Sequence, residues 1–226
     1  MYKLCLTLCS LFVCCQLMAQ TSSIISQQST PGFGAITIAV SNDHAADGDS
    51  YFAEADRLEK IGQMNEALTL FGKAAFEYNT IKDFNAFGTA LMRLSNVHLL
   101  LNHYKEAEQV ILNVALKNYS KTGNKRGQMD AYHQLGKIYY ASDKLTQSLW
   151  FYTQQGILAK QLKINASYLD SMLGIIFVKI KKKQYTMALK DVGTAELFAT
   201  NSKINDYGTQ FIYTRSVIDE KSNYKK

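Results

Sequence analysis

The chain has 226 residues, among them one proline, 13 glycines and four cysteines, and carries a formal net charge of +6 at pH 7. Few glycines and a single proline suit one elongated helical domain rather than several globular ones. The basic excess is moderate, and the Lys179 to Lys183 cluster fits a solvated turn better than a phosphate-binding patch. We therefore expect no nucleic-acid partner.

Residues 1–20 read as a secretory signal peptide. They contain Lys3, an apolar run from Leu4 to Met18, and a small residue, Ala19, before Gln20. The run is too short to span a bilayer comfortably and has no stop-transfer flank. The sequence therefore predicts a periplasmic or secreted protein, whose mature form has no cysteine and hence no disulfide or thiol chemistry.

An alternative is a lipoprotein acylated at Cys14 or Cys15, which would place the protein on a membrane. Val13 and Cys14 are poor small residues to precede the cleaved bond, which disfavours this reading. Residues 21–48 are rich in Ser, Gln, Thr, Gly and Asp and hold the only proline, Pro31. They predict a flexible leader, and the strand-like alternation of residues 35–40 is taken as disordered or loosely docked because it has no strand to pair with.

Helical periodicity begins near Asp49 and continues as pairs of helices. The expected helices cover residues 49–61 and 64–79, 84–101 and 104–119, 125–141 and 145–161, and 166–181 and 184–200. The small residues of the first helices are Ala55, Ser95, Gly136 and Gly174, with bulky residues three later at Leu58, His98, Tyr139 and Phe177. Those of the second helices are Ala67, Ala107, Ser148 and Ala188, with bulky residues four later at Phe71, Ile111, Tyr152 and Val192.

A small residue is needed wherever two helices approach closely, and a bulky one fills the adjacent hole. The second-helix landmarks are 40, 41 and 40 residues apart, whereas the first-helix landmarks are 40, 41 and 38 apart. This difference predicts a longer exposed turn in the last pair, at Lys181-Lys182-Lys183. Repetition at such a period is typical of a solenoid.

At this point the residues resemble the tetratricopeptide repeat (TPR) family. The family pattern W-x2-L-G-x2-Y is met by Tyr132-x2-Leu135-Gly136-x2-Tyr139, and A-x3-F by Ala67-x3-Phe71. The resemblance implies an all-α, right-handed superhelical solenoid of antiparallel helix pairs over residues 49–226. The chain departs from the pattern in its period of about 40 rather than 34 and in lacking the closing proline. It also has His98 in place of an aromatic residue and Gln155 in place of a later alanine.

Helix-start signals recur once per repeat, at Asp83, Asn124, Asn165 and Asn205. Their side chains can accept hydrogen bonds from the unpaired amides of a first helical turn. A fifth first helix is therefore expected to begin near Asp206 and to cap about four helix pairs. It places Tyr207, Phe211 and Ile218 on one face, with Arg215, Asp219 and Lys221 elsewhere.

The sequence has no Gly-rich phosphate loop, no G-x-S-x-G and no His-Glu-x-x-His. His98 and His103 are five residues apart, so they do not share a helix face as metal ligands four apart would. We therefore expect no enzyme, no cofactor, no metal site and no small-molecule substrate. The function favoured is an exported scaffold that binds a protein or peptide, and the alternative is an extracytoplasmic sensory module of a signalling system.

The family resemblance also implies a binding surface, because the first helices of TPR proteins line a concave groove. Counting from the small residues places Arg93, Asn96, His133, Lys137 and Tyr140 on the groove face of repeats two and three. Two cations, an amide and an aromatic ring there suggest an extended acidic peptide as ligand, beside the plainer interpretation of a solvated polar face. Trp150, the only tryptophan, is expected on the convex side, packed against a neighbouring helix or exposed as an anchor for a partner.

Overall fold

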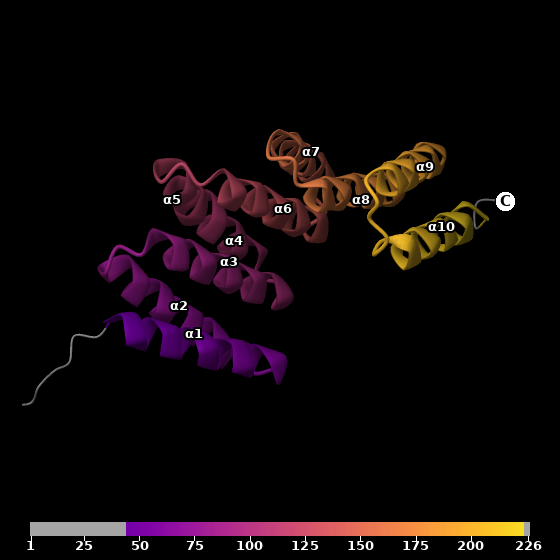
Figure 1. Cartoon of the computed structure of the whole chain (residues 1–226). Helices are drawn as coiled ribbons and strands as arrows, with labels where there is room; N and C mark the ends of the chain where they lie inside the picture. Colours follow the sequence, from indigo (N-terminus) through magenta and orange to yellow (C-terminus); the bar gives the residue numbers. More distant parts are fainter. Residues whose placement is uncertain (1–43, 224–226) are drawn as a thin grey trace, which may run out of the picture. The chain divides into compact units, whose positions relative to one another are not determined.

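The computed structural model describes residues 44–223, and within them the chain forms a succession of antiparallel helices without a strand (Figure 1). The helices are α1 (His44–Lys60), α2 (Met64–Thr80), α3 (Phe84–Leu100), α4 (Tyr104–Gln109), α5 (Leu116–Lys121), α6 (Lys125–Ala141), α7 (Leu145–Gln161), α8 (Asn165–Lys181), α9 (Tyr185–Asn201) and α10 (Gly208–Asn223), with a π-helical segment η1 (Val110–Ala115) between α4 and α5. The predicted signal peptide, Cys14, Cys15 and most of the leader lie outside the described residues and stay predictions.

Helix α1 begins five residues before the expected start at residue 49, so the end of the predicted leader, 44–48, is helical. Packing explains the early start. Gly48 lies against the ring of Tyr78 in α2, whose hydroxyl donates to the Asp49 carboxylate at 2.7 Å. These contacts hold the first turns of α1 on α2, which the polar composition of the segment did not reveal.

The helices are joined by tight turns that each contain one residue with positive φ. These residues are Gly62, Lys82, Asn102, Gly123, Asp143, Lys163, Lys183 and Lys203. After α2, for example, the amide of Lys82 donates to Asn79 O at 3.1 Å and that of Asp83 to Tyr78 O at 2.9 Å. This pair of bonds is the Schellman motif, which satisfies the last carbonyls of a helix and reverses the chain in three residues.

Replacing Lys183 with Gly is expected to raise the free energy of unfolding by about 0.5–1 kcal/mol. Lys183 has φ 61°, a left-handed conformation that costs an L-residue about 1–2 kcal/mol and that glycine adopts without this cost. Glycine also loses more conformational entropy on folding, which cancels part of the gain. The neighbouring Lys182 has φ −76° and ψ 3°, so Lys182→Gly is a control that should lower stability. Urea denaturation of both variants tests this, and equal shifts would contradict it.

The predicted longer turn in the last pair is wrong. Residues 182–184 join α8 to α9, just as 142–144 join α6 to α7. Because α8 begins 40 residues after α6, the residue equivalent to Gly136 is Ile176, not Gly174. Gly174 serves another contact: it faces the ring of Tyr152 from the side opposite Gly136. The sequence pattern therefore assigns Gly174 to the wrong helix contact.

The other small-residue landmarks are confirmed as close helix contacts, since they are fully buried. In the second pair the Ser95 hydroxyl on the first helix donates to Ala107 O on the second at 3.0 Å. In the third pair the roles are exchanged, and Ser148 on the second helix donates to Gly136 O on the first at 2.8 Å. Such a bond requires backbones that nearly touch, which explains why no larger residue stands there.

The 41-residue spacing between Ala107 and Ser148 has a local cause. Segments α4, η1 and α5 form one continuous helix of three parts with six residues each, one residue longer than the 17 of α2 or α7. A π-turn accommodates one additional residue without breaking a helix. Beyond it, Tyr119 packs between Gly88 and Gly127, where a Cβ atom on either glycine would overlap the ring.

Two of the four predicted helix caps are confirmed. Asp83 accepts from the amides of Asn85 and Ala86 at 3.1 and 2.9 Å, and Asn124 accepts from Gly127 at 2.8 Å. The cap of α8 is instead Ile164, whose side chain makes no such bond, so Asn165 is already inside the helix. Helix α10 starts at Gly208, two residues after Asp206 and so near the expected start, and Asn205 lies in the segment before it.

Helix α10 packs on α8 and α9 through the predicted apolar face. Phe211 and Ile218 are buried in a cluster with residues of those two helices. Arg215 forms an ion pair with Glu196 of α9 at 2.5 Å, and Tyr207 just before the helix bonds to α8. No helix within 44–223 is long and apolar enough to cross a membrane.

Candidate functional site

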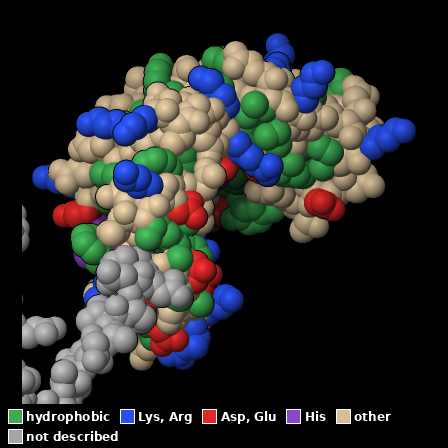
Figure 2. Space-filling view, turned by 60° about the vertical axis from the view of Figure 1, so that its left-hand side comes forward, with side chains coloured by type: hydrophobic (Ala, Val, Ile, Leu, Met, Phe, Trp, Pro, Cys, Tyr) green, Lys and Arg blue, Asp and Glu red, His purple; other side chains and the backbone are tan. Residues whose placement is uncertain are grey.

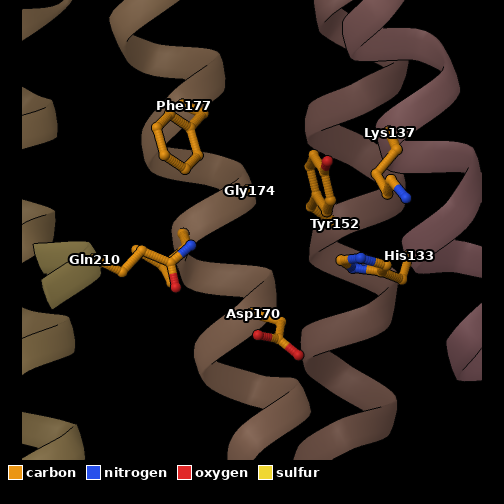
Figure 3. A pocket seen from close by; sticks show the side chains of 8 residues that line it. His133, Lys137, Tyr152, Asp170, Gly174, Phe177 and Gln210 are labelled. Atoms are coloured by element: carbon orange, nitrogen blue, oxygen red, sulfur yellow. The ribbon is translucent and has the colours of Figure 1, made fainter. Parts of the chain in front are cut away.

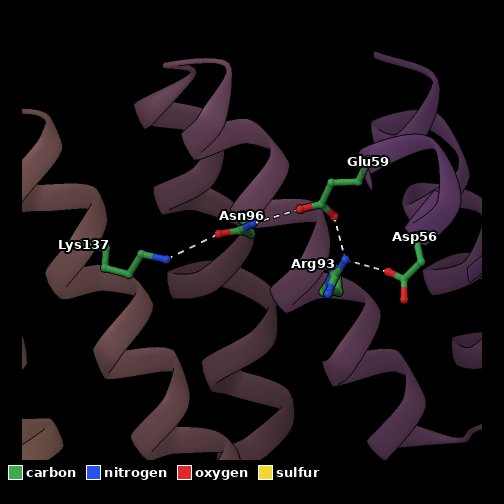
Figure 4. Close-up of polar contacts among 5 residues, drawn as sticks. All are labelled: Asp56, Glu59, Arg93, Asn96 and Lys137. Carbon is green, nitrogen blue, oxygen red and sulfur yellow. Dashed lines mark hydrogen bonds and ion pairs between the residues drawn. The ribbon is translucent and has the colours of Figure 1, made fainter. Parts of the chain in front are cut away.

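Polar side chains link α1, α3 and α6, which are the first helices of three successive pairs (Figure 4). Arg93 of α3 reaches back to α1, where its Nη2 atom lies 2.6 Å from Asp56 Oδ1 and 2.7 Å from Glu59 Oε2. The amide of Asn96, one turn further along α3, donates to the other oxygen of Glu59 at 3.2 Å. Two of the predicted groove residues therefore already have carboxylate partners inside the protein.

Lys137 of α6 differs from Arg93 and Asn96 in its hydrogen-bond and ion-pair partners. Its ammonium donates to Asn96 Oδ1 at 3.4 Å, a long hydrogen bond to a neutral group. None of the ion pairs among the described residues includes Lys137. Desolvation lowers the pKa of this half-buried lysine. Lys137 is thus a partly desolvated cation without an ion-pair partner among the described residues.

A hollow of about 300 Å³ lies beside Lys137, between α6, α7, α8 and α10 (Figure 3). We use "the hollow" for the space lined by His133, Lys137, Tyr152, Asp170, Leu173, Gly174, Phe177 and Gln210. Tyr152, Leu173 and Phe177 provide apolar surface. The polar groups come from both sides, with His133 and Lys137 on α6 facing Asp170 on α8 and Gln210 on α10.

His133 is held by the buried amide of Gln155. The Gln155 amide nitrogen donates to Ser167 O of α8 at 3.0 Å, which turns its oxygen toward His133 Nδ1 at 3.1 Å. The oxygen can only accept, so Nδ1 carries the ring proton. This explains the glutamine at a position where the family pattern has alanine: it ties α6, α7 and α8 together and orients the imidazole.

The hollow favours neutral His133. Burial is the largest influence and lowers the pKa of its imidazole, and the positive charge of Lys137 acts in the same direction. The hydrogen bond with Gln155 and the carboxylates of Asp170 and Asp130 act in the opposite direction but do not prevail. A neutral ring protonated at Nδ1 leaves Nε2 as a hydrogen-bond acceptor.

Tyr140, the last predicted groove residue, is covered by Lys181 of α8. The Lys181 ammonium lies 4.7 Å from the centre of the Tyr140 ring and donates to Tyr140 O at 2.8 Å, and it pairs with Asp143 at 3.1 Å. Lys179 pairs with Asp191 of α9. Two of the four lysines between Lys179 and Lys183 therefore contact neighbouring parts of the stack. Figure 2 shows Lys and Arg spread among acidic and apolar side chains on the face it displays.

The five predicted groove residues thus separate into two groups. Arg93, Asn96 and Tyr140 are engaged with neighbouring helices, whereas His133 and Lys137 meet at the hollow. Sequence reasoning did not assign to the site the residues that complete the hollow from other helices, namely Tyr152, Asp170, Leu173, Gly174, Phe177 and Gln210. The one available signal was Gln155, noted as a departure from the family pattern.

Trp150 on α7 is 52% exposed and lies edge-on to Tyr132 at 6.3 Å and to Phe151 at 4.6 Å between ring centres. Trp150 therefore packs on the neighbouring helix α6 and also exposes part of its side chain to solvent. His98 and His103 have ring centres 5.8 Å apart, and burial first, then the charge of His103, lowers the pKa of His98. Within the described residues no group of three or more His, Cys, Asp or Glu is arranged to hold a metal ion.

No protein-family model matches the chain, and no curated protein matches it. Solved structures do resemble it. The apo form of RapI has a TM-score of 0.67 at 11% identity, covering 79% of this chain and 68% of that one. BtubC from P. vanneervenii has a TM-score of 0.63 at 15% identity, covering 71% and 66%. The nearly identical TPR-like repeats assigned to a kinesin light chain of Podosopora anserina score 0.60 at 12% identity, covering 81% and 99%.

At these identities the likeness shows the fold alone. The chain is an all-α solenoid of helix pairs with a TPR-like fold, which confirms the expected fold class. It spans about two thirds of the length of the first two structures.

Proposed function

We propose that the chain is an exported scaffold without catalysis that binds a peptide or protein through the inner face of its first helices. The single observation that carries this proposal is Lys137, a half-buried cation with a long bond to Asn96 and no acidic partner among the described residues. Export rests on the N-terminal sequence pattern, and N-terminal sequencing of the mature protein tests it.

The charge of Lys137 indicates which group of the partner it would meet. An ammonium already removed from bulk water gains more from a carboxylate or carbonyl than an exposed one does, because screening is weaker there. Arg93 does not compete for the same ligand, since Asp56 and Glu59 neutralise it from α1. The open part of the inner face therefore lies toward α6, α8 and α10, where the hollow provides room for a side chain.

An extended peptide suits this surface better than a folded protein face. The hollow is about 300 Å³, comparable to the space one or two residues occupy, and its apolar walls adjoin isolated polar groups. Such a site recognises a short segment by a few charge-assisted hydrogen bonds and by burial of one side chain. The proposed ligand is an extended segment with an acidic group placed at Lys137.

The test begins with a pull-down from the native extract using the immobilised mature chain. Binding of the captured partner is then measured by titration calorimetry for the wild type and for Lys137→Met. Loss of a charge-assisted hydrogen bond should weaken binding about tenfold, with an unchanged circular dichroism spectrum. The matched control is Lys160→Met, because Lys160 is exposed on α7 over the Tyr168 ring and outside the hollow.

Equal affinity of the wild type and a folded Lys137→Met variant would exclude the inner face around Lys137. Attention would then move to the surface around Trp150, whose side chain is partly exposed. A loss in the Lys160→Met control alone would point in the same direction.

A further inference from the structure

The polar groups of the hollow are sorted into two ends. His133 and Lys137 lie four residues apart on one face of α6, about one helical turn. Opposite His133, the carboxylate of Asp170 enters from α8, as Figure 3 shows. Opposite Lys137, the ring of Tyr152 lies against Gly174 of α8. One end therefore offers acceptors, and the other offers a donor beside an aromatic ring.

The acceptor end is preorganised by three neighbouring helices. Gln155 fixes the proton of His133 on Nδ1, so Nε2 is an acceptor with no hydrogen bond from any described residue. The hydroxyl of Tyr207 donates to Asp170 Oδ1 at 2.7 Å, which orients this carboxylate and leaves its second oxygen without a described donor. Two fixed acceptors, one of them negatively charged, match a positively charged group that donates several hydrogen bonds.

The donor end requires the opposite chemistry. Lys137 can only donate, and it carries a positive charge, so it matches a carbonyl or carboxylate oxygen. The ring of Tyr152 lies beside Lys137 and against Gly174, and Phe177 lines the hollow from α8. Apolar atoms of a ligand would lie against these rings.

We propose that the hollow binds an α-ammonium group together with the carbonyl or carboxylate next to it. His133 Nε2 and Asp170 accept from the ammonium, and Lys137 donates to the adjacent oxygen. This unit occurs at the first residue of a peptide and in a free α-amino acid. The inference rests on the proposed function in so far as both take the inner face as the binding surface.

Ligands of a single charge fit this arrangement less well. An anion alone would satisfy Lys137 but would lie near the carboxylate of Asp170. A cation alone would satisfy Asp170 and His133 but would leave Lys137 unpaired and repelled. A ligand with both groups a few ångströms apart satisfies each end, which is how an interface of balanced charge selects its partner.

The experiment uses the full chain and two libraries of degenerate tripeptide amides, one with a free amino terminus and one acetylated. Binding is measured by ligand-observed NMR and then by titration calorimetry on enriched sequences. The free-amine library should bind, and acetylation should weaken binding about tenfold or more because it removes the charge and two donors. A mixture of free amino acids forms a second arm that distinguishes the two sources.

Variants assign the contacts. Asp170→Asn should lose about tenfold for the free-amine ligand, and little for the acetylated one. Tyr207→Phe should lose a few-fold while keeping the same preference for a free amine, as expected of a residue that orients Asp170. Asp219→Asn, exposed on α10 and outside the hollow, is the matched control and should leave affinity unchanged. Circular dichroism verifies that each variant is folded.

The outcomes separate this inference from the proposed function. Equal binding of free and acetylated tripeptides, with loss in Lys137→Met, would overturn the inference and leave the scaffold proposal standing. No binding of tripeptides or amino acids at millimolar concentration would also overturn the inference. Binding by free-amine tripeptides supports a peptide terminus as the ligand, and binding by amino acids alone supports a free amino acid.

Discussion

Replacing Gly136 with Leu is expected to lower the free energy of unfolding by about 1–3 kcal/mol, the range for overpacking a filled core. A Cβ atom at Gly136 would lie 2.6 Å from Cε1 of Tyr152, far inside van der Waals contact. On its other side the ring lies against Gly174, where a Cβ would also lie 2.6 Å from it, so the ring can yield only by moving into the hollow. The bond from Ser148 to Gly136 O shows how closely α6 and α7 approach.

The matched control is Gly193→Ala in the middle of α9, where no atom lies within 4 Å of an added Cβ. Alanine there should raise stability by about 0.5–1 kcal/mol, because glycine costs conformational entropy in a helix. Urea denaturation of both variants reports the opposite signs. A Gly136→Leu variant with the wild-type midpoint would mean that α6 and α7 do not meet at Gly136.

Removal of the Arg93 side chain is the second change with a large expected effect. Arg93→Ala should lower the free energy of unfolding by about 1–3 kcal/mol, because it leaves the carboxylates of Asp56 and Glu59 unpaired on α1. The Glu59 side chain is only 14% exposed, so water replaces the lost partner poorly. Arg93 also covers the ring of Phe71 at 5.3 Å, and that contact is lost as well.

Lys137→Met is the control for Arg93→Ala, and its stability should stay within about 0.5 kcal/mol of the wild type, because no described carboxylate depends on Lys137. Adding Glu59→Gln to Arg93→Ala should restore part of the loss. Hydrogen exchange should place the damage in the first two helix pairs, since solenoid contacts are between neighbours. Equal midpoints for Arg93→Ala and Lys137→Met would refute the ion-pair account.

The helix pairs were predictable because each depends on a pattern within about 20 residues. The signals are local ones: the apolar period, the small residues at Ala67, Ala107 and Ser148, and the cap at Asp83. The structure confirms them. Asn165 failed as a cap because hydrogen-bonding capacity alone does not decide where a helix begins. The backbone turn at Lys163 had already placed Asn165 inside α8.

The register of the last pair needed the three-dimensional structure. Gly174 looked like the partner of Gly136, and the mismatch of two residues suggested a longer turn. Only the position of the Tyr152 ring shows that the two glycines serve one aromatic residue from opposite sides. Likewise, the additional residue between Ala107 and Ser148 was visible in the spacing, but its accommodation as a π-turn was not.

The sequence by itself determined that this chain is a stack of helix pairs, and it predicted that Lys137 and His133 share one face of a helix. Tertiary structure alone decided which of the polar residues there are available. Arg93 meets Glu59 across 34 positions of sequence, and Asp170 meets Tyr207 across 37. The physical reason is that helix formation depends on neighbours in the chain, whereas ion pairing and desolvation depend on neighbours in space, which come from the next repeat.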